Sequence, residues 1–245
     1  MGKIVSVVSG KGGTGKSTLC AMLGMALVRS GHTVLLIDCD CGMRGLDILM
    51  EVERNLVFDI SDVVKGNCTE EKIIYPCEFL SGLFLISASQ NPDDLVSKEE
   101  MQRFTHKIRN RFDYILLDSP SGIGKGMETA VYPADMCLVV ANTDPASVRC
   151  CVGVRRKLND FGKNNIRLII NKFSKREFAK ANVYPDLDRI IDETGIQLIG
   201  IIAEDKKTVR SLPKTGQSVK GLTAMECVRR ISDRIDGKNI PLLIC

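Results

Sequence analysis

A glycine-rich segment near the start of the chain, residues 10–17, carries residue types suited to binding phosphate groups. Its sequence GKGGTGKS fits the pattern G-x-x-x-x-G-K-[ST]. Glycines let backbone N–H groups turn inward around phosphate oxygens, and the start of the following helix adds the positive end of its dipole. In this pattern Lys16 reaches the β- and γ-phosphates, and the Ser17 hydroxyl ligates Mg²⁺. The segment predicts a nucleoside triphosphate site but gives its first lysine, Lys11, no role.

Two strand ends supply carboxylates that could face this loop. The run FDYILLDSPSG ends an apolar strand in Asp118, from which a carboxylate can hold the hydration shell of Mg²⁺. The run LLIDCDCG carries Asp38 and Asp40, which would point the same way if the strand continued through both. One acid near the metal and one near an attacking water would suit nucleotide hydrolysis. Two solvated turn acids are the alternative interpretation.

Short apolar runs alternate with amphipathic segments along the whole chain, a pattern typical of a parallel sheet flanked by helices. The expected strands are nearly continuous in apolar character, as in strands covered on both faces. A capping box at Ser97 and Glu100, Pro145 after Asp144, and Gly31 mark helix ends. We therefore expect an α/β fold with a doubly wound, mostly parallel sheet. Strands are predicted at residues 3–9, 33–38, 83–88, 114–118, 136–141, 166–171 and 197–202, and helices near 16–30, 97–110, 145–161, 186–194 and 222–235.

The composition fits one reduced, cytoplasmic domain. The chain has 245 residues, a formal net charge of +4 and no repeat or linker-like segment, so we expect a single domain over residues 1–237 with a short tail, 238–245. The ten cysteines form no CxxC pair and lie mostly in apolar runs, as small hydrophobic residues do in a reducing compartment. No secretory signal is present, and no apolar stretch approaches the ~18–20 residues that cross a bilayer.

Several of these motifs resemble those of the MinD/ParA family of deviant Walker A ATPases, with its MinD branch the nearest. KGGTGKST, residues 11–18, resembles the family's loop K-G-G-x-G-K-[ST]-T. DCDCGMRGLDILM, residues 38–50, is similar to the MinD switch I segment, and LLDSPSGIG to switch II. LIINK, residues 168–172, resembles the strand end whose Asn reads adenine, and IIAEDKKTVRS the segment that follows. The resemblance runs in order from about residue 3 to residue 237.

The resemblance implies a P-loop fold that binds Mg-ATP and dimerises face to face across two nucleotides. Lys11 would then reach the nucleotide of the partner subunit, and groups supplied in this way are worth about 10³–10⁵ in rate. Asp40 would orient the attacking water, beside the catalytic lysines Lys11 and Lys16. The metal residues would be Ser17, Asp38 and Asp118. Nucleotide contacts are implied for Gly12, Gly13, Thr14, Gly15, Lys16, Ser17, Thr18, Asn171, Lys172 and Glu204.

The function implied by the resemblance is a slow, dimerisation-dependent ATP hydrolase that acts as a switch in spatial organisation, such as placing a division site or an organelle. ATP would drive homodimerisation and hydrolysis would release it. A regulatory protein partner is expected, with its identity open. Asp144 falls where MinD proteins carry a Glu that touches the partner's ribose.

The chain departs from the MinD pattern at its end and on one helix. RIDGKNIPLLIC contains no Lys-rich aromatic helix after Gly237, so stable membrane binding is not expected from this chain. The run Ser147 to Val152, SVRCCV, lacks the acids that MinD proteins present to regulatory partners. Ala203 stands where the family usually has Pro, and Gly124 replaces a common acid of switch II. Cys39, Cys41, Cys150 and Cys151 leave a redox role open.

Two other functions remain open. One is a ParA-like partition ATPase that coats DNA, for which basic residues in VRRK and NKFSKREFAK could serve, although a solvated helix face is the favoured interpretation. The other is an ATP-dependent ligase of the dethiobiotin or cobyrinate type. Retention of Lys11 together with the MinD-type switch I argues against the ligase.

Overall fold

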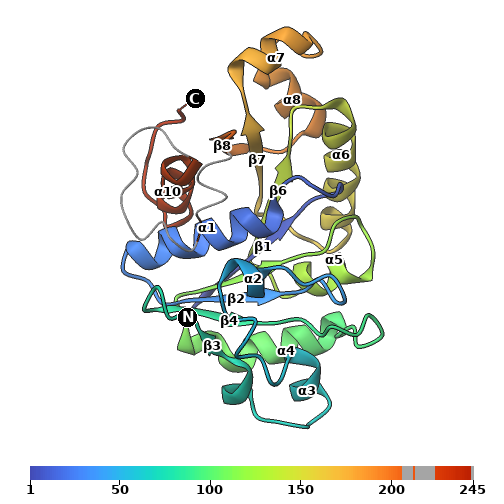
Figure 1. Cartoon of the computed structure of the whole chain (residues 1–245). Coiled ribbons are helices and arrows are strands. Elements are labelled where there is room, and N and C mark those ends of the chain that lie inside the picture. Colours follow the sequence, from blue (N-terminus) through green and yellow to red (C-terminus); the bar gives the residue numbers. More distant parts are fainter. Residues whose placement is uncertain (206–211, 213–223, 244–245) are drawn as a thin grey trace.

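One sheet of eight strands runs through the protein (Figure 1). The computed structural model describes residues 1–205, 212 and 224–243. The strands are β1 (Lys3–Val8), β2 (Val34–Asp38), β3 (Tyr75–Pro76), β4 (Leu83–Ile86), β5 (Tyr114–Asp118), β6 (Met136–Ala141), β7 (Ile166–Phe173) and β8 (Leu198–Ala203). Their order is β3-β4-β2-β5-β1-β6-β7-β8, and every neighbouring pair is parallel except β3 with β4.

Helices cover both faces of this sheet, as expected for a doubly wound α/β fold. On one face α1 packs against α10, and on the other α4 contacts α5 and α6 contacts α8 (Figure 1). The helices are α1 (Lys16–Arg29), α2 (Leu46–Leu49), α3 (Ile60–Val64), α4 (Lys98–Ile108), α5 (Lys125–Val131), α6 (Pro145–Asp160), α7 (Lys175–Ala181), α8 (Leu187–Thr194) and α10 (Ala224–Ile235), with 3-10 turns η1 (Glu70–Ile73) and η2 (Arg109–Arg111).

The predicted helix ends are confirmed by their hydrogen bonds. Ser97 and Glu100 form the complete capping box that begins α4. The Asp144 side chain accepts a hydrogen bond from the Ser147 N–H at 3.0 Å, just before α6. Gly31 follows α1 with a φ of 96°, a conformation that favours glycine. These local signals therefore mark the end of α1 and the starts of α4 and α6.

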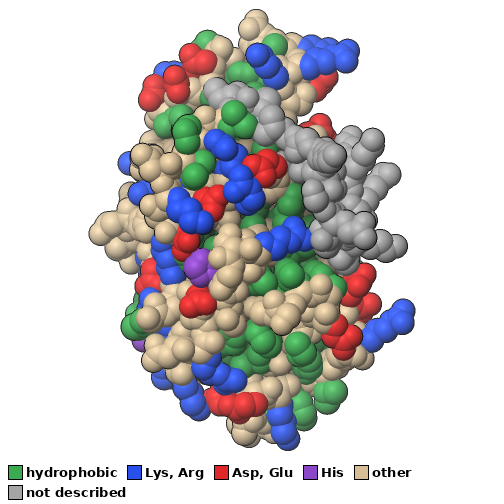
Figure 2. All heavy atoms as spheres, turned by 90° about the vertical axis from the view of Figure 1, so that its left-hand side faces the viewer, with side chains coloured by type: hydrophobic (Ala, Val, Ile, Leu, Met, Phe, Trp, Pro, Cys, Tyr) green, Lys and Arg blue, Asp and Glu red, His purple; other side chains and the backbone are tan. Residues whose placement is uncertain are grey.

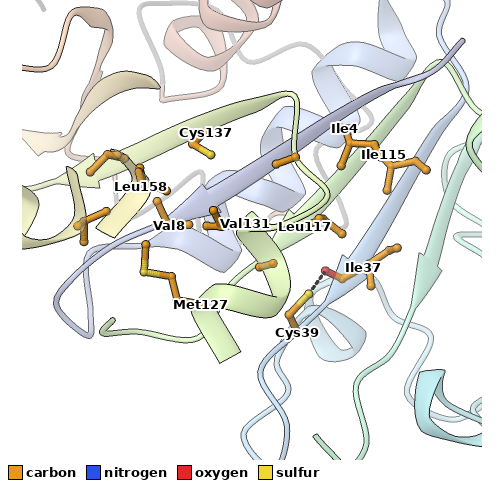
Figure 3. Packing of buried hydrophobic residues seen from close by; sticks show 14 of the residues in the cluster. Ile4, Val8, Ile37, Cys39, Ile115, Leu117, Met127, Val131, Cys137 and Leu158 are labelled. Carbon is orange, nitrogen blue, oxygen red and sulfur yellow. Dashed lines mark hydrogen bonds between the residues drawn. The ribbon is translucent and has the colours of Figure 1, made fainter. Parts of the chain in front are cut away.

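Alternation along the strands divides the core into two clusters, one beneath each helical layer. Ile4 and Val8 of β1 belong to the cluster under α4, α5 and α6, whereas Val5 and Val7 belong to the cluster under α1 and α10. Figure 3 shows the first cluster, in which strand side chains face Met127 of α5. Because both faces are buried, the strands carry almost no polar residues before their ends.

The seven predicted strands and five predicted helices are all present, with ends shifted by a few residues. Only Ala224 to Ile235 of the helix expected at 222–235 can be compared, because residues 222 and 223 lie outside the described part. The prediction omitted β3 and the short helices α2, α3, α5 and α7. Each of these four helices has seven residues or fewer, too short for a repeating apolar pattern to stand out.

The cysteines behave as the sequence predicts. No disulfide joins two of the nine cysteines in the described residues, and six of the nine are buried. Their pairing into a redox site therefore has no support in the described part of the chain. Among the described helices, none combines the length and the apolar character that crossing a bilayer demands.

Acidic and basic side chains are interspersed on the side of the molecule that carries α1 and α10 (Figure 2). Asp233 of α10 pairs with Arg229 at 2.9 Å and with Lys238 at 2.8 Å. Asp236 lies 3.1 Å from His32 and accepts a hydrogen bond from the Tyr114 hydroxyl at 2.8 Å. The Asp236 contacts fasten the end of α10 to the turn that precedes β2 and to β5, whereas Asp233 pairs within α10 and the turn after it.

Candidate functional site: the glycine loop at the carboxyl edge of the sheet

The glycine loop joins the end of β1 to the start of α1, at the edge where the parallel strands end. Gly13 and Gly15 have φ angles of 76° and 93°, which other residues adopt only at a cost. Within the described residues, no hydrogen bond uses the backbone N–H of residues 12–16 as its donor. These donors are available to an anion at the start of α1, where the helix dipole also favours negative charge.

Side chains outside the loop hold its carbonyl groups. The Ser9 hydroxyl donates to the Lys11 carbonyl at 2.8 Å. The Asn171 amide donates to the Thr14 carbonyl at 2.7 Å, and the Lys172 ammonium donates to the Gly13 carbonyl, also at 2.7 Å. The structure thus brings the end of β7 to the loop, and the Asn171 and Lys172 donors, which the resemblance assigns to the nucleotide, are used on the loop itself.

Lys16 begins α1 with only 8% of its surface exposed. Burial lowers the pKa of its ammonium, while the nearby carboxyls of Asp118 and Asp40 act to raise it. A buried cation therefore lies near Asp118 and Asp40, two of the three acids that the sequence singled out. This is the arrangement expected of a lysine that awaits a phosphate group.

Asp118 ends β5, directly between the ends of β1 and β2. It is 1% exposed, and its Oδ1 atom has no hydrogen-bond partner among the described residues. Burial, reinforced by the charge of Asp38, raises the pKa of Asp118 to about 8, although Ser17 and Lys16 act to lower it. A buried carboxyl oxygen without a hydrogen-bond partner, close to Ser17 and Lys16, is an oxygen donor that a bound cation could use.

Asp38 lies opposite Asp118 in the sheet and is equally buried. Its carboxylate accepts hydrogen bonds from the backbone N–H groups of Asp40, Gly45 and Leu46, at 2.9, 3.0 and 3.2 Å. Burial raises the pKa of Asp38, and these three hydrogen bonds oppose that rise. Asp38 therefore fixes the start of α2 as well as contributing charge near the loop.

Asp40 does not follow Asp38 on the same strand face, because β2 ends at Asp38. The backbone turns there, as the hydrogen bond from the Asp40 N–H to the Asp38 side chain shows. The expectation that Asp38 and Asp40 point the same way along a continuous strand is therefore wrong, because the strand does not reach Asp40. Burial raises the pKa of the half-buried Asp40, and Lys16 acts to lower it. The turn after Asp38, rather than a continued strand, brings Asp40 close to Lys16.

Lys11 pairs with Asp144, at the start of α6, across 2.9 Å. The two side chains are 44% and 40% exposed, so the pair is open to solvent. Burial acts to raise the pKa of Asp144, but hydrogen bonds from Lys11 and the Ser147 N–H outweigh it and leave the pKa below its usual value. The contact between Lys11 and Asp144 was not predicted from the sequence, because 133 positions separate the two residues.

Helix α6 also packs directly on the loop. A Cβ atom at Gly10 would lie 2.7 Å from Cβ of Cys150, closer than real contacts allow. A larger residue at position 10 would therefore collide with α6, and the phosphate-loop sequence pattern also calls for glycine there. Cys150 belongs to the surroundings of the site, a position that no signal in the sequence identified.

A pocket of about 130 Å³ opens beside the loop. Leu19 and Met22, three positions apart on α1, make one apolar wall, and Ile202 of β8 contributes to another. A flat apolar base fits such a lining better than a charged group does. Glu204 lies next to this pocket through its backbone, whose N–H donates to the Phe173 carbonyl at 2.9 Å. The pocket is lined by Gly15, Thr18, Leu19, Met22, Asn171, Lys172, Ile202, Ala203, Asp205 and Ala224.

The donor set fits Mg²⁺ rather than a metal held wholly by protein. In the described part of the chain, no group of three or more His, Cys, Asp or Glu side chains could hold a metal ion. Mg²⁺ commonly takes one or two carboxylates and fills its remaining positions with water and substrate phosphates. The free Oδ1 of Asp118 and the hydroxyl of Ser17 are suitable oxygen donors for it.

Comparisons with known proteins agree with this geometry. Residues 5–219 match the family model described as CobQ/CobB/MinD/ParA nucleotide binding domain. The septum site-determining protein MinD of Synechocystis is 36% identical over 99% of this chain and 92% of its own length. MinD in the MinC:MinD cell division protein complex of Aquifex aeolicus superposes with a TM-score of 0.88 at 34% identity, covering 99% of this chain and 98% of that one. The cell division ATPase MinD of Pyrococcus furiosus gives a TM-score of 0.82 at 25% identity, covering 97% and 99%.

These matches span nearly the whole chain and include the loop, both acidic strand ends and the pocket. The three relatives described above are MinD proteins, and the chain belongs to the CobQ/CobB/MinD/ParA nucleotide-binding domain family.

Proposed function

We propose that this protein is a Mg²⁺-dependent ATPase that dimerises when it binds ATP and acts as a switch that positions a division site or another cellular structure. The observation that carries the proposal is the buried, unpartnered Oδ1 of Asp118 beside Lys16, at the mouth of a loop with free N–H donors. Members of this family are ATPases, and the Pyrococcus furiosus relative is named as one. We propose residues 1–237 as the single ATPase domain and 238–245 as its tail.

In this proposal the loop N–H groups of residues 12–16 and the Lys16 ammonium hold the phosphates. Ser17 and Asp118 hold the Mg²⁺, with Asp38 close behind. Bound Mg²⁺ would supply positive charge where charge develops on the phosphates. Thr18 and the apolar pocket place the base, near Glu204 and the end of β7. Asp40 lies near enough to Lys16 for their charges to interact, and we assign it to orienting the attacking water.

Lys11 is assigned to the partner subunit's nucleotide. Its ammonium is half-exposed and paired with Asp144 in the single chain, so a second subunit could draw it away at modest cost. A cation that arrives only on dimerisation stabilises the transition state only in the assembled form. Turnover would then depend on assembly, which is what a switch requires.

A regulatory protein partner is part of the proposal. The Aquifex aeolicus relative, 34% identical, forms a complex with MinC. In this chain the exposed residues of the first turns of α6 include Arg149 and no acid after Asp144. We therefore expect a partner whose contacts with α6 differ from contacts made to acidic residues.

The two lysines of the loop test the proposal directly. Lys16→Ala should abolish ATP binding, because the phosphates lose their buried counter-ion. Lys11→Ala should bind ATP with nearly unchanged affinity yet fail to dimerise and lose at least about 10²-fold in turnover. Size-exclusion chromatography with and without Mg-ATP, together with ATPase rates over a range of protein concentrations, measures both effects. Lys180→Ala, which removes an exposed lysine of α7, is the matched control. A Lys11→Ala variant that hydrolyses ATP at the wild-type rate would falsify the role in trans.

A further inference from the structure

Two consecutive side chains at the end of β7 reach the phosphate loop across more than 150 positions of sequence. The Asn171 amide donates to the Thr14 carbonyl, and the Lys172 ammonium donates to the Gly13 carbonyl, both at 2.7 Å. Asn171 is 9% exposed, so its hydrogen bond is shielded from water. Adjacent carbonyls of the loop are thus held by adjacent residues of one strand.

The backbone of β7 is distorted where these residues occur. The register between β7 and β8 shifts between Ile170 and Phe173, and Lys172 has a φ of 54°. A lysine rarely adopts this left-handed conformation, and such strain persists only where surrounding contacts impose it. The irregularity lets two neighbouring side chains reach the same loop, whereas neighbours on a regular strand point to opposite faces.

The loop in turn has room for only a glycine at the point of contact. A Cβ atom at Gly15 would lie 2.5 Å from the Asn171 amide nitrogen. Gly15 also has a φ of 93°, so the residue is needed for its conformation and for the approach of Asn171. The loop and the end of β7 are therefore matched to each other in shape.

We propose that Asn171 and Lys172 are positioning residues that brace the phosphate loop, a role that rests on the proposed ATP site. Each peptide unit carries its carbonyl and the next N–H on opposite sides. Holding the Gly13 and Thr14 carbonyls toward β7 therefore turns the N–H groups of Thr14 and Gly15 the other way. The brace sets the direction of these donors before phosphate arrives, and so reduces the ordering that binding requires.

A ligand without a base separates this role from contact with adenine. We would measure binding of Mg-ATP and of Mg-tripolyphosphate to the full chain by isothermal titration calorimetry. Asn171→Ala and Lys172→Met should weaken both ligands by the same factor, about tenfold for each lost hydrogen bond. Lys175→Met, which removes an exposed lysine three positions along, should change neither. Lys172→Gly should behave like Lys172→Met, because the ammonium and not the backbone strain provides the brace.

Backbone ¹⁵N relaxation of the nucleotide-free protein gives a second, ligand-independent measurement. The N–H groups of residues 12–16 donate no hydrogen bond within the described residues, so their order parameters report how firmly the loop itself is held. These order parameters should fall in Asn171→Ala and Lys172→Met, while those of the sheet core keep their wild-type values. Unchanged loop order parameters in both variants would overturn the proposal. Loss of ATP affinity with unchanged tripolyphosphate affinity would also overturn it, in favour of direct contact with the base. Wild-type protein that binds neither ligand would refute the proposed function instead, and the relaxation data would still decide on the brace.

Discussion

Two regions of the described structure contain buried carboxyl groups in opposite surroundings. At the loop edge, Asp118 has an orphaned oxygen and a pKa raised to about 8 by burial. At the end of α10, Asp233 is just as enclosed, with 7% of its side chain exposed, but Arg229 and Lys238 both pair with it. Asp236 nearby is likewise satisfied, by His32 and Tyr114.

The presence or absence of partners for the buried carboxyl groups distinguishes a ligand site from a region that stabilises the fold. A buried carboxyl group without a partner costs stability when it ionises, and groups of this kind cluster at sites that bind a ligand. In the α10 region the charge of Asp233 is compensated by Arg229 and Lys238, and the contacts of Asp236 with His32 and Tyr114 join α10 to other parts of the chain. The α10 network therefore needs no ligand, whereas the loop edge needs a cation and a phosphate. Substitutions in the two regions should have opposite effects on folding.

The largest expected effect is the loss of function in Asp118→Asn. The amide cannot supply the anionic oxygen that the Mg²⁺ site needs, so ATP turnover should fall by at least about 10²-fold. Steady-state ATPase assays with saturating Mg²⁺ measure this. Asp233→Asn, which changes an equally buried carboxylate in the other region, should keep wild-type turnover. Equal losses in the two variants would contradict the distinction between the regions.

The same Asp118→Asn variant should be more stable than wild type without nucleotide, and its advantage should grow with pH. The folded-state pKa of Asp118, about 8, lies above the unfolded value, so the folded protein holds the proton longer. Its ionisation therefore lowers wild-type stability progressively as pH rises from about 4 to about 8. Thermal melts of both proteins between pH 5 and pH 9 test this sign. A difference in Tm that is constant or shrinks with pH would show that Asp118 is not the destabilising group.

Asp233→Asn should lower stability by about 1–2 kcal/mol, or about 2–8 °C in Tm. The substitution weakens two ion pairs at once, but Arg229 and Lys238 are half-exposed and can return to water. Melting curves followed by circular dichroism measure the loss. An unchanged Tm would mean that the two ion pairs of Asp233 do not contribute to stability.

The smallest effect is expected for Tyr114→Phe. It removes the hydroxyl that donates to Asp236 while His32 still contacts that carboxylate. One hydrogen bond of this kind contributes about 1 kcal/mol, or about 2–4 °C in Tm. Nucleotide affinity should not change, since the side chain lies at the opposite end of β5 from Asp118. Weaker ATP binding in this variant would mean that the two regions are coupled through β5.

Most of the fold follows from patterns within short stretches of the chain. The seven apolar runs became seven strands, and Ser97, Pro145 and Gly31 marked helix ends through local backbone chemistry. The short helix α2 and the turn after Asp38 were not predicted, because they depend on backbone hydrogen bonds to a buried carboxylate. No pattern of hydrophobic residues records such bonds.

The sequence by itself determined the doubly wound sheet, the phosphate loop and the identity of the acids at its edge, since spacing and residue type carry that information. Only the tertiary structure decided that Lys11 rests on Asp144, that Cys150 packs on Gly10 and that Asn171 and Lys172 hold the loop carbonyls. These contacts join residues more than 130 positions apart, at an edge created by the pairing of parallel strands. Their geometry depends on strand register and on a local irregularity of β7, neither of which residue type alone specifies.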